Sequence, residues 1–177
     1  TVEILRNIQR AKEFGIEVTD YFIDFPSIMN RKDMVSKRLS SGVEQLMKLN
    51  QVRVVKGEGF IPEPGIVEVI DTEGNNEIIT TKNIIIATGS KVFSLPIPGI
   101  DTEGVITSDE ALSMNSLPEQ IIIIGGGVVG IEWACIFNAL GVKTTLIEML
   151  PRILLSIDEE IANRLTQLLK RRGIGIL

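Results

Sequence analysis

The stretch IIIIGGGVVGIEWACIFNALGVKTTLIE, residues 121–148, decides the fold. Its first four residues, Ile121–Ile124, are isoleucines and lead directly into Gly125, Gly127 and Gly130, which form a G-x-G-x-x-G pattern. A short apolar run of this kind is typical of a strand that is buried on both faces. The first glycine permits a tight turn, the second lets a pyrophosphate approach the backbone, and the third lets the helix pack on the strand. The stretch therefore predicts a strand, a turn and a helix that bind a dinucleotide.

A second strand and an acid extend this pattern. Val142–Ile147 predicts a second strand with apolar ends, which Glu148 follows, 18 residues past Gly130. An acid at this place accepts hydrogen bonds from a ribose 2′-hydroxyl and repels a 2′-phosphate, so the sequence predicts NAD rather than NADP. An isolated G-x-G-x-x-G often marks only a flexible loop. The strand before it, the helix after it and the acid beyond favour a dinucleotide site here.

Composition and charge limit the class of protein. The chain has 177 residues, of which 44% are hydrophobic, and its net charge is −5. This length can bury a sizeable core, and the acidic balance leaves no dominant basic surface for nucleic acid or anionic membranes. No run of about 18 apolar residues is present, and residues 1–10 lack the pattern of a signal peptide. We therefore expect a cytoplasmic protein that binds neither nucleic acid nor membranes.

The chain contains one cysteine and no histidine. Cys135 lies in the predicted helix near Ile131 and Ala134 without a basic neighbour, which favours a buried structural thiol over a nucleophile. A single cysteine cannot form a disulfide within the chain. Histidine, the commonest general base and metal ligand, is absent, and no cluster of acidic residues has the spacing of metal ligands. The sequence thus predicts no catalytic residue and no metal site in this chain.

The N-terminal part predicts two helices, Val2–Phe14 with Gly15 as its stop and Phe25–Leu49 opened by Asp24 and Pro26. From Gln51 the hydrophobic period changes to two, which predicts an antiparallel meander of three strands. These strands are Val52–Gly57, Ile66–Asp71 and Glu77–Thr80.

Asn83–Ala87 is another short apolar run that predicts a doubly buried strand. It ends in Thr88, Gly89 and Ser90, a small polar turn that suits a ligand and equally suits an ordinary exit from a strand.

Residues 90–120 are rich in proline and glycine, which predicts a crossing between domains with a boundary near Leu117. Beyond the dinucleotide motif, Ser156–Glu159 is a candidate capping box for a helix that ends at Gly173. We expect the apolar face of that helix to consist of Ile161, Leu165, Leu168 and Leu169. Ile174–Leu177 then predicts a third strand. Only the first half of a dinucleotide-binding unit can be drawn from these residues, so we expect the chain to be a fragment.

Four strings, kept in order, resemble the pyridine nucleotide-disulfide oxidoreductase family: NIIIATGS at 83–90, TSDEAL at 107–112, IIIIGGGVVGIE at 121–132 and TLIEMLPRIL at 145–154. The resemblance implies an α/β fold of the FAD/NAD(P)-binding, Rossmann-like type. It implies that residues 1–117 are part of an FAD-binding domain with its linker, and that residues 118–177 are the first half of an NAD-binding domain.

The resemblance also implies roles for individual residues. Gly59, at the end of VVKGEG, is similar to a glycine that contacts FAD, and Thr88, Gly89 and Ser90 match the second flavin-contacting turn of the family. The implied NAD residues are Gly125, Gly126, Gly127, Val128, Val129, Gly130, Ile131, Glu132 and Glu148. Glu132 matches an acid that lies near the nicotinamide and flavin, whereas without the family it also fits a solvated helix carboxylate.

Within the family, the strings look most like the members that oxidise dihydrolipoamide through a redox-active disulfide and FAD and pass hydride to NAD. Such members imply a homodimer whose partner is the lipoyl domain of a 2-oxo acid dehydrogenase or glycine cleavage complex. The disulfide, the first flavin motif and the catalytic histidine of the family have no match here, so we expect the chain alone to be inactive. Members of the NADH oxidase or mercuric reductase type, and a non-enzymatic nucleotide-binding module, remain alternatives.

Overall fold

A computed structural model describes residues 1–93 and 95–177 of the chain. Contacts divide it into two compact units. One unit joins residues 1–32 to the described residues from Leu95 onward, and the other is Asp33–Phe93. The predicted division at residue 117 into two cofactor-binding domains stays a prediction.

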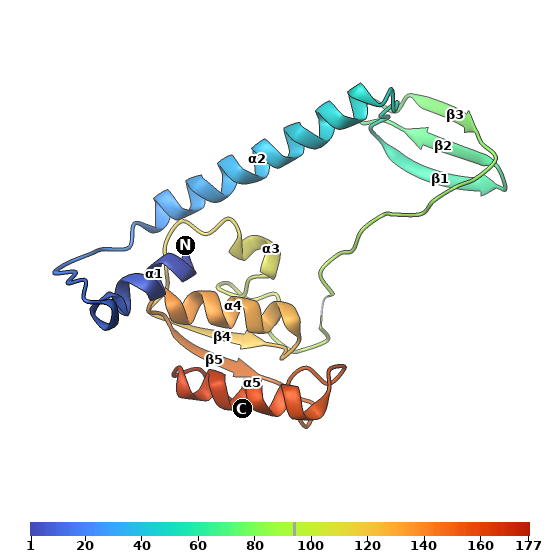
Figure 1. Ribbon diagram of the computed structural model, residues 1–177. Coiled ribbons are helices and arrows are strands. Elements are labelled where there is room, and N and C mark those ends of the chain that lie inside the picture. Colours follow the sequence, from blue (N-terminus) through green and yellow to red (C-terminus); the bar gives the residue numbers. More distant parts are fainter. Residues whose placement is uncertain (94) are drawn as a thin grey trace. The chain divides into compact units, whose positions relative to one another are not determined.

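The first unit contains the predicted α/β layer, which confirms the fold class (Figure 1). Its sheet has the order β4 (Gln120–Ile124), β5 (Lys143–Ile147) and β6 (Gly175–Ile176), and both strand pairs are parallel. The connections between strands are helices α4 (Val128–Ala139) and α5 (Glu159–Arg171). The order strand, glycine turn, helix and strand is the one predicted from the isoleucine run and the glycine motif.

The core of this unit lies on one face of the sheet. Both helices and the central strand contribute to one buried cluster: Ile131, Ala134, Leu146, Ile153, Leu169 and Ile174. Right-handed crossovers between strands that are added in one direction place both helices on the same face. Ile122 and Ile124 are directed to the other face and are 64% and 49% exposed. The prediction that Ile121–Ile124 is buried on both faces is therefore wrong in this structure.

Helix α5 differs from its prediction at its start and in its buried face. Asp158 is the N-cap, and its carboxylate accepts a hydrogen bond from the Ile161 N–H at 3.1 Å. The predicted capping box at Ser156–Glu159 is therefore wrong. Ala162 and the predicted Leu169 are buried and the predicted Leu165 packs against the core, whereas Ile161 and Leu168 are 58% and 41% exposed. The predicted apolar face is therefore confirmed for Leu165 and Leu169 and wrong for Ile161 and Leu168, because packing against the sheet decides which side is buried and the spacing of leucines alone does not specify it.

The N-terminal helices agree closely with their predictions. Helix α1 (Val2–Gln9) continues into a 3-10 turn, η1 (Ala11–Phe14), and Gly15 ends it with a φ of +75°. Helix α2 (Phe25–Leu49) has the predicted bounds. Leu5 of α1 and Phe25 of α2 pack with Leu140, which follows α4, in a second buried cluster.

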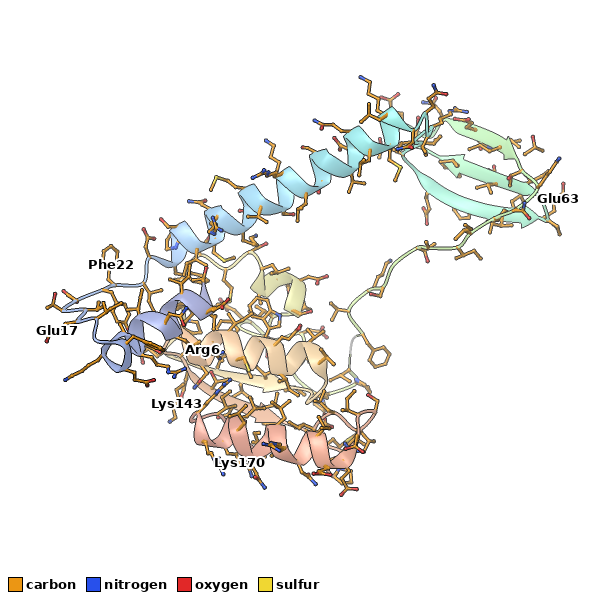
Figure 2. The ribbon with its side chains drawn as sticks, viewed as in Figure 1. Arg6, Glu17, Phe22, Glu63, Lys143 and Lys170 are labelled. Atoms are coloured by element: carbon orange, nitrogen blue, oxygen red, sulfur yellow. The ribbon has the colours of Figure 1, made fainter. Side chains whose placement is uncertain are left out.

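The loop between η1 and α2 carries exposed apolar side chains. Phe22, for example, is 87% exposed and is labelled in Figure 2. Further along the chain, α3 (Ser108–Ala111) is a single helical turn that begins after Thr107.

The second unit contains the predicted antiparallel meander, in the order β1 (Glu58–Glu63), β2 (Ile66–Ile70) and β3 (Asn76–Thr80). The first strand was predicted at Val52–Gly57, which is wrong, because the strand lies six residues later. It contains Pro62, which an interior strand excludes but an edge strand tolerates. The pairing of β1 with β2 shifts its register between Phe60 and Glu63, at this proline.

The predicted strand Asn83–Ala87 does not form, and Ile85 is 91% exposed. A strand needs a neighbour for its backbone N–H and C=O groups, and none of the described residues pairs with this segment. Among the described residues, no helix combines the length and the apolar character needed to cross a membrane.

Candidate dinucleotide-binding site

The glycine turn between β4 and α4 has the two steric features that its sequence predicts. Gly125 has a φ of +110°, a conformation that side chains disfavour, and its N–H donates to the Ile147 carbonyl oxygen at 2.9 Å. At Gly130, an added Cβ would collide with the Gly125 carbonyl oxygen. The first and third glycines are therefore required by the local backbone, whether or not a ligand is present.

Gly127 differs from these two glycines, because no atom lies within 4 Å of the place where its Cβ would be. It is the N-cap residue of α4, with extended backbone and no side-chain cap for the helix N–H groups. Such N–H groups and the positive end of the helix dipole attract an anion. The space beside Gly127 is thus open to a phosphate that approaches the start of α4.

Glu148 lies just after β5, beside this turn, and its carboxylate is bound by two backbone groups. Its Oε2 accepts a hydrogen bond from the Gly126 N–H at 2.6 Å, and its Oε1 accepts one from the Leu150 N–H at 2.8 Å. These bonds, first that of Leu150 and then that of Gly126, lower the pKa of Glu148 below its ordinary value of 4.5. Glu148 is therefore a fixed negative charge at neutral pH.

The turn and the acid lie in one open groove with a volume of about 440 Å³. Its lining residues are Gly126, Gly127, Val128, Glu148, Leu150, Leu154, Leu155 and Ser156. Apolar walls with a few fixed polar groups are typical of sites for small molecules. Here the leucines offer an apolar surface, while Glu148 and the start of α4 offer an acceptor and donors.

The structure brings together four of the predicted NAD residues, Gly126, Gly127, Val128 and Glu148. Of the others, Gly125 and Gly130 shape the turn. Val129 and Glu132 lie exposed on α4 outside the groove lining, and the Ile131 side chain is buried in the core. The roles of these residues in binding NAD stay predictions.

Four groove residues were not predicted: Leu150, Leu154, Leu155 and Ser156. Their place in the sequence, directly after a strand, could have predicted them. In open α/β sheets, ligands bind outside the carboxyl ends of the strands, so the loop that follows β5 is a candidate wall for the groove.

The predicted FAD residues lie in the second unit. Gly59 is part of β1 and pairs with Val69 of β2. Thr88, Gly89 and Ser90 lie in an exposed extended segment, where Gly89 has a φ of +73°. No hydrogen bond among the described residues joins Gly59 to this segment, and their contacts with FAD stay predictions.

Cys135 is half-buried and packs against the core cluster of the first unit, as a structural thiol does. Within the described part of the chain, His, Cys, Asp and Glu side chains form no group of three that suits a metal ion.

Comparison with known proteins identifies relatives of the whole chain. Residues 4–177 match the model of a family described as pyridine nucleotide-disulphide oxidoreductase. The dihydrolipoyl dehydrogenase of Bacillus subtilis is 41% identical over 100% of this chain, which covers 39% of that protein. The dihydrolipoyl dehydrogenase of Acholeplasma laidlawii is 39% identical over 100% of the chain, which covers 53% of it.

Among solved structures, the flavoprotein disulfide reductase RclA of Escherichia coli, as a Cu(II) complex, matches with a TM-score of 0.75. It is 28% identical, and the match covers 99% of this chain and 38% of that one. The chain thus spans about two fifths to one half of the length of these matched proteins.

Proposed function

Because the chain belongs to the pyridine nucleotide-disulphide oxidoreductase family, we propose that it forms part of a dihydrolipoyl dehydrogenase. Relatives of that name are 34–41% identical over 90–100% of the chain, which supports this choice within the family. In the proposed enzyme, dihydrolipoamide is oxidised to lipoamide through a redox-active disulfide and FAD, and hydride passes to NAD. The chain would supply the middle of the FAD-binding domain and the first half of the NAD-binding domain.

The groove of the first unit would hold the adenosine half of NAD. Glu148 would accept a hydrogen bond from a ribose hydroxyl, since the two oxygens of a carboxylate can together accept about four hydrogen bonds. Gly127 and the first N–H groups of α4 would face the pyrophosphate, and the groove leucines would contact the adenine. Bound NAD supplies the nicotinamide ring that accepts hydride.

The observation that carries this proposal is the carboxylate of Glu148, held by Gly126 at the mouth of the glycine turn. A fixed negative charge favours a free ribose 2′-hydroxyl and repels the 2′-phosphate of NADP. In this proposal the turn binds the pyrophosphate, and the carboxylate distinguishes the ribose of NAD from the 2′-phosphorylated ribose of NADP.

Titration calorimetry of the chain with NAD and NADP tests the proposal. We expect tighter binding of NAD than of NADP, and we expect Glu148→Arg in the intact enzyme to reverse the preference. The loss of a charged hydrogen bond predicts roughly tenfold to hundredfold weaker NAD binding. Glu103→Arg, which makes the same charge change at an exposed residue of the same unit, is the control. An unchanged preference in Glu148→Arg would refute the ribose assignment.

The remaining features of the proposed enzyme follow from the family alone. Gly59 and the turn at Thr88, Gly89 and Ser90 would contact FAD. The intact enzyme would be a homodimer that serves the lipoyl domain of a 2-oxo acid dehydrogenase or glycine cleavage complex. A cytoplasmic location stays a proposal, because relatives named mitochondrial, such as that of Dictyostelium discoideum at 39% identity, match the chain nearly as well as bacterial ones.

A further inference from the structure

Arg152 lies in the loop after β5, whose residues Leu150, Leu154, Leu155 and Ser156 line the groove. Its guanidinium donates three hydrogen bonds to carbonyl oxygens of the same loop. Nη1 donates to Leu154 at 2.8 Å, and Nη2 donates to Leu155 at 3.0 Å and to Ile157 at 3.0 Å. The loop has no regular secondary structure, so one planar cation provides partners that a helix or sheet would otherwise provide.

The loop needs this support because Leu154 has a left-handed backbone, with a φ of +51°. A side chain disfavours that conformation, and it persists where surrounding contacts impose it. Two further bonds meet at Leu154. Its carbonyl oxygen also accepts from the Ile157 N–H at 2.9 Å, and its N–H donates to the Gly126 carbonyl oxygen at 2.9 Å.

The chain of contacts from Arg152 therefore reaches the acid that faces the ribose. Arg152 donates to the Leu154 carbonyl oxygen, and the Leu154 N–H donates to the Gly126 carbonyl oxygen. The Gly126 N–H in turn donates to the Glu148 carboxylate. The same contacts present Leu154 and Leu155 to the groove.

An arginine four residues past the ribose acid otherwise suggests a ligand for the 2′-phosphate of NADP. The three bonds to carbonyl oxygens argue against that role, because they commit the guanidinium to the loop itself.

We propose that Arg152 is a positioning residue of the adenosine subsite, which holds the 152–157 loop and the glycine turn in register and does not contact the 2′-position. The proposal rests on the proposed NAD site. It assigns to Arg152 an effect on NAD and NADP alike, since both share the adenine, the ribose ring and the pyrophosphate.

The test uses the whole chain with Arg152→Met, Arg152→Lys and the control Arg164→Met, which removes an exposed arginine from α5. Without ligand, we expect amide hydrogen exchange at Leu154 and Ile157 to become roughly tenfold faster in Arg152→Met. We expect NAD and NADP to bind roughly tenfold more weakly, each by the same factor. Arg152→Lys should also speed amide exchange and weaken the binding of both dinucleotides, because lysine keeps the charge but lacks the planar fork of donors.

A larger loss for NADP than for NAD in Arg152→Met would make Arg152 a phosphate ligand and overturn the proposal. Unchanged amide exchange at Leu154 would overturn it as well, and so would an equal effect of Arg164→Met. If the unchanged chain binds no dinucleotide while Arg152→Met still speeds amide exchange, the NAD site proposed for the groove of this chain fails and the anchoring of the loop stands.

Discussion

At the scale of single residues, the three glycines of the turn have different physical roles. Gly125 needs its positive φ, Gly130 has a carbonyl oxygen where a Cβ would be, and Gly127 has open space. Sequence alone assigns all three to one motif. The structure separates the glycines that the fold requires from the one that only a ligand would require.

We predict that Gly130→Ala and Gly127→Ala separate folding from binding. Gly130→Ala should lower the free energy of unfolding by about 3 kcal/mol, the upper end of the cost of overpacking. Gly127→Ala should cost about 1 kcal/mol or less, as an N-cap change, and should weaken NAD binding by at least roughly tenfold. Denaturant unfolding and calorimetry measure the two effects. Normal NAD affinity in Gly127→Ala would contradict the placement of the pyrophosphate.

Glu148 makes stability depend on pH. Its pKa is lowered in the folded chain, so its bonds to Gly126 and Leu150 stabilise the fold above pH 4.5, and this contribution is lost as the pH falls through the lowered pKa. We predict that the melting temperature of Glu148→Gln falls less between pH 6 and pH 3 than that of the unchanged chain. The pKa values of Asp24 and Glu110 are also lowered, so part of the fall in melting temperature should remain in Glu148→Gln. Parallel slopes for the two proteins would contradict this role of Glu148.

At the scale of elements, helix starts show what a local pattern can and cannot predict. The pattern T-x-x-E at Thr107 forms a complete capping box, in which Thr107 and Glu110 exchange hydrogen bonds at 3.3 and 2.7 Å. The similar pattern at Ser156 forms none, because the N-cap of α5 is Asp158, two residues later. Both patterns satisfy the same local rule for a capping box. They differ in that Ser156 lies in the loop whose Ile157 carbonyl oxygen accepts a hydrogen bond from Arg152.

Asp158→Ala and Ser156→Ala test this assignment of the cap. Asp158→Ala should lower the free energy of unfolding by about 1 kcal/mol, since it leaves the Ile161 N–H without its partner. Ser156→Ala should stay within about 0.5 kcal/mol of the unchanged chain. Denaturant unfolding of both variants provides the measurement. A cost at Ser156 that equals the cost at Asp158 would favour the capping box predicted from sequence.

At the scale of the whole molecule, the chain holds the groove beside Glu148 without the thiol and imidazole groups that the proposed reaction uses. It has one cysteine and no histidine, so it can form no internal disulfide and has no imidazole base. Its parallel sheet also leaves Ile122 and Ile124 exposed on one face. Both features agree with a chain that matches about two fifths of a dihydrolipoyl dehydrogenase.

We predict that the chain alone gives no dihydrolipoamide-dependent reduction of NAD, even with added FAD. The physical reason is the lack of a cysteine pair to accept electrons from the dithiol. Absorbance of NADH is the measurement, with the full-length Bacillus subtilis dihydrolipoyl dehydrogenase as the positive control. Measurable turnover by this chain would overturn the proposal that it is only part of the enzyme.

Much of the fold was predictable because it depends on interactions between near neighbours in sequence. The glycine turn after β4, the helix Phe25–Leu49 and the stop at Gly15 follow from backbone sterics and short-range periodicity, and the structure confirms each. The acid at the end of β5 was predictable from its distance to the turn.

The rest depended on which distant segments meet. Burial of Ile121–Ile124 on one face only, the failure of Asn83–Ala87 to form a strand, and the leucine wall of the groove each depend on neighbours far away in the chain. So does the choice of Leu154, Leu155 and Ile157 as partners of Arg152 within a folded loop. The sequence by itself determined the glycine turn and the charge on which the proposed NAD site rests, because sterics and ionisation are local. Only the tertiary structure decided the walls of the site and what holds them, because burial and hydrogen-bond partners are set by the packing of separate elements.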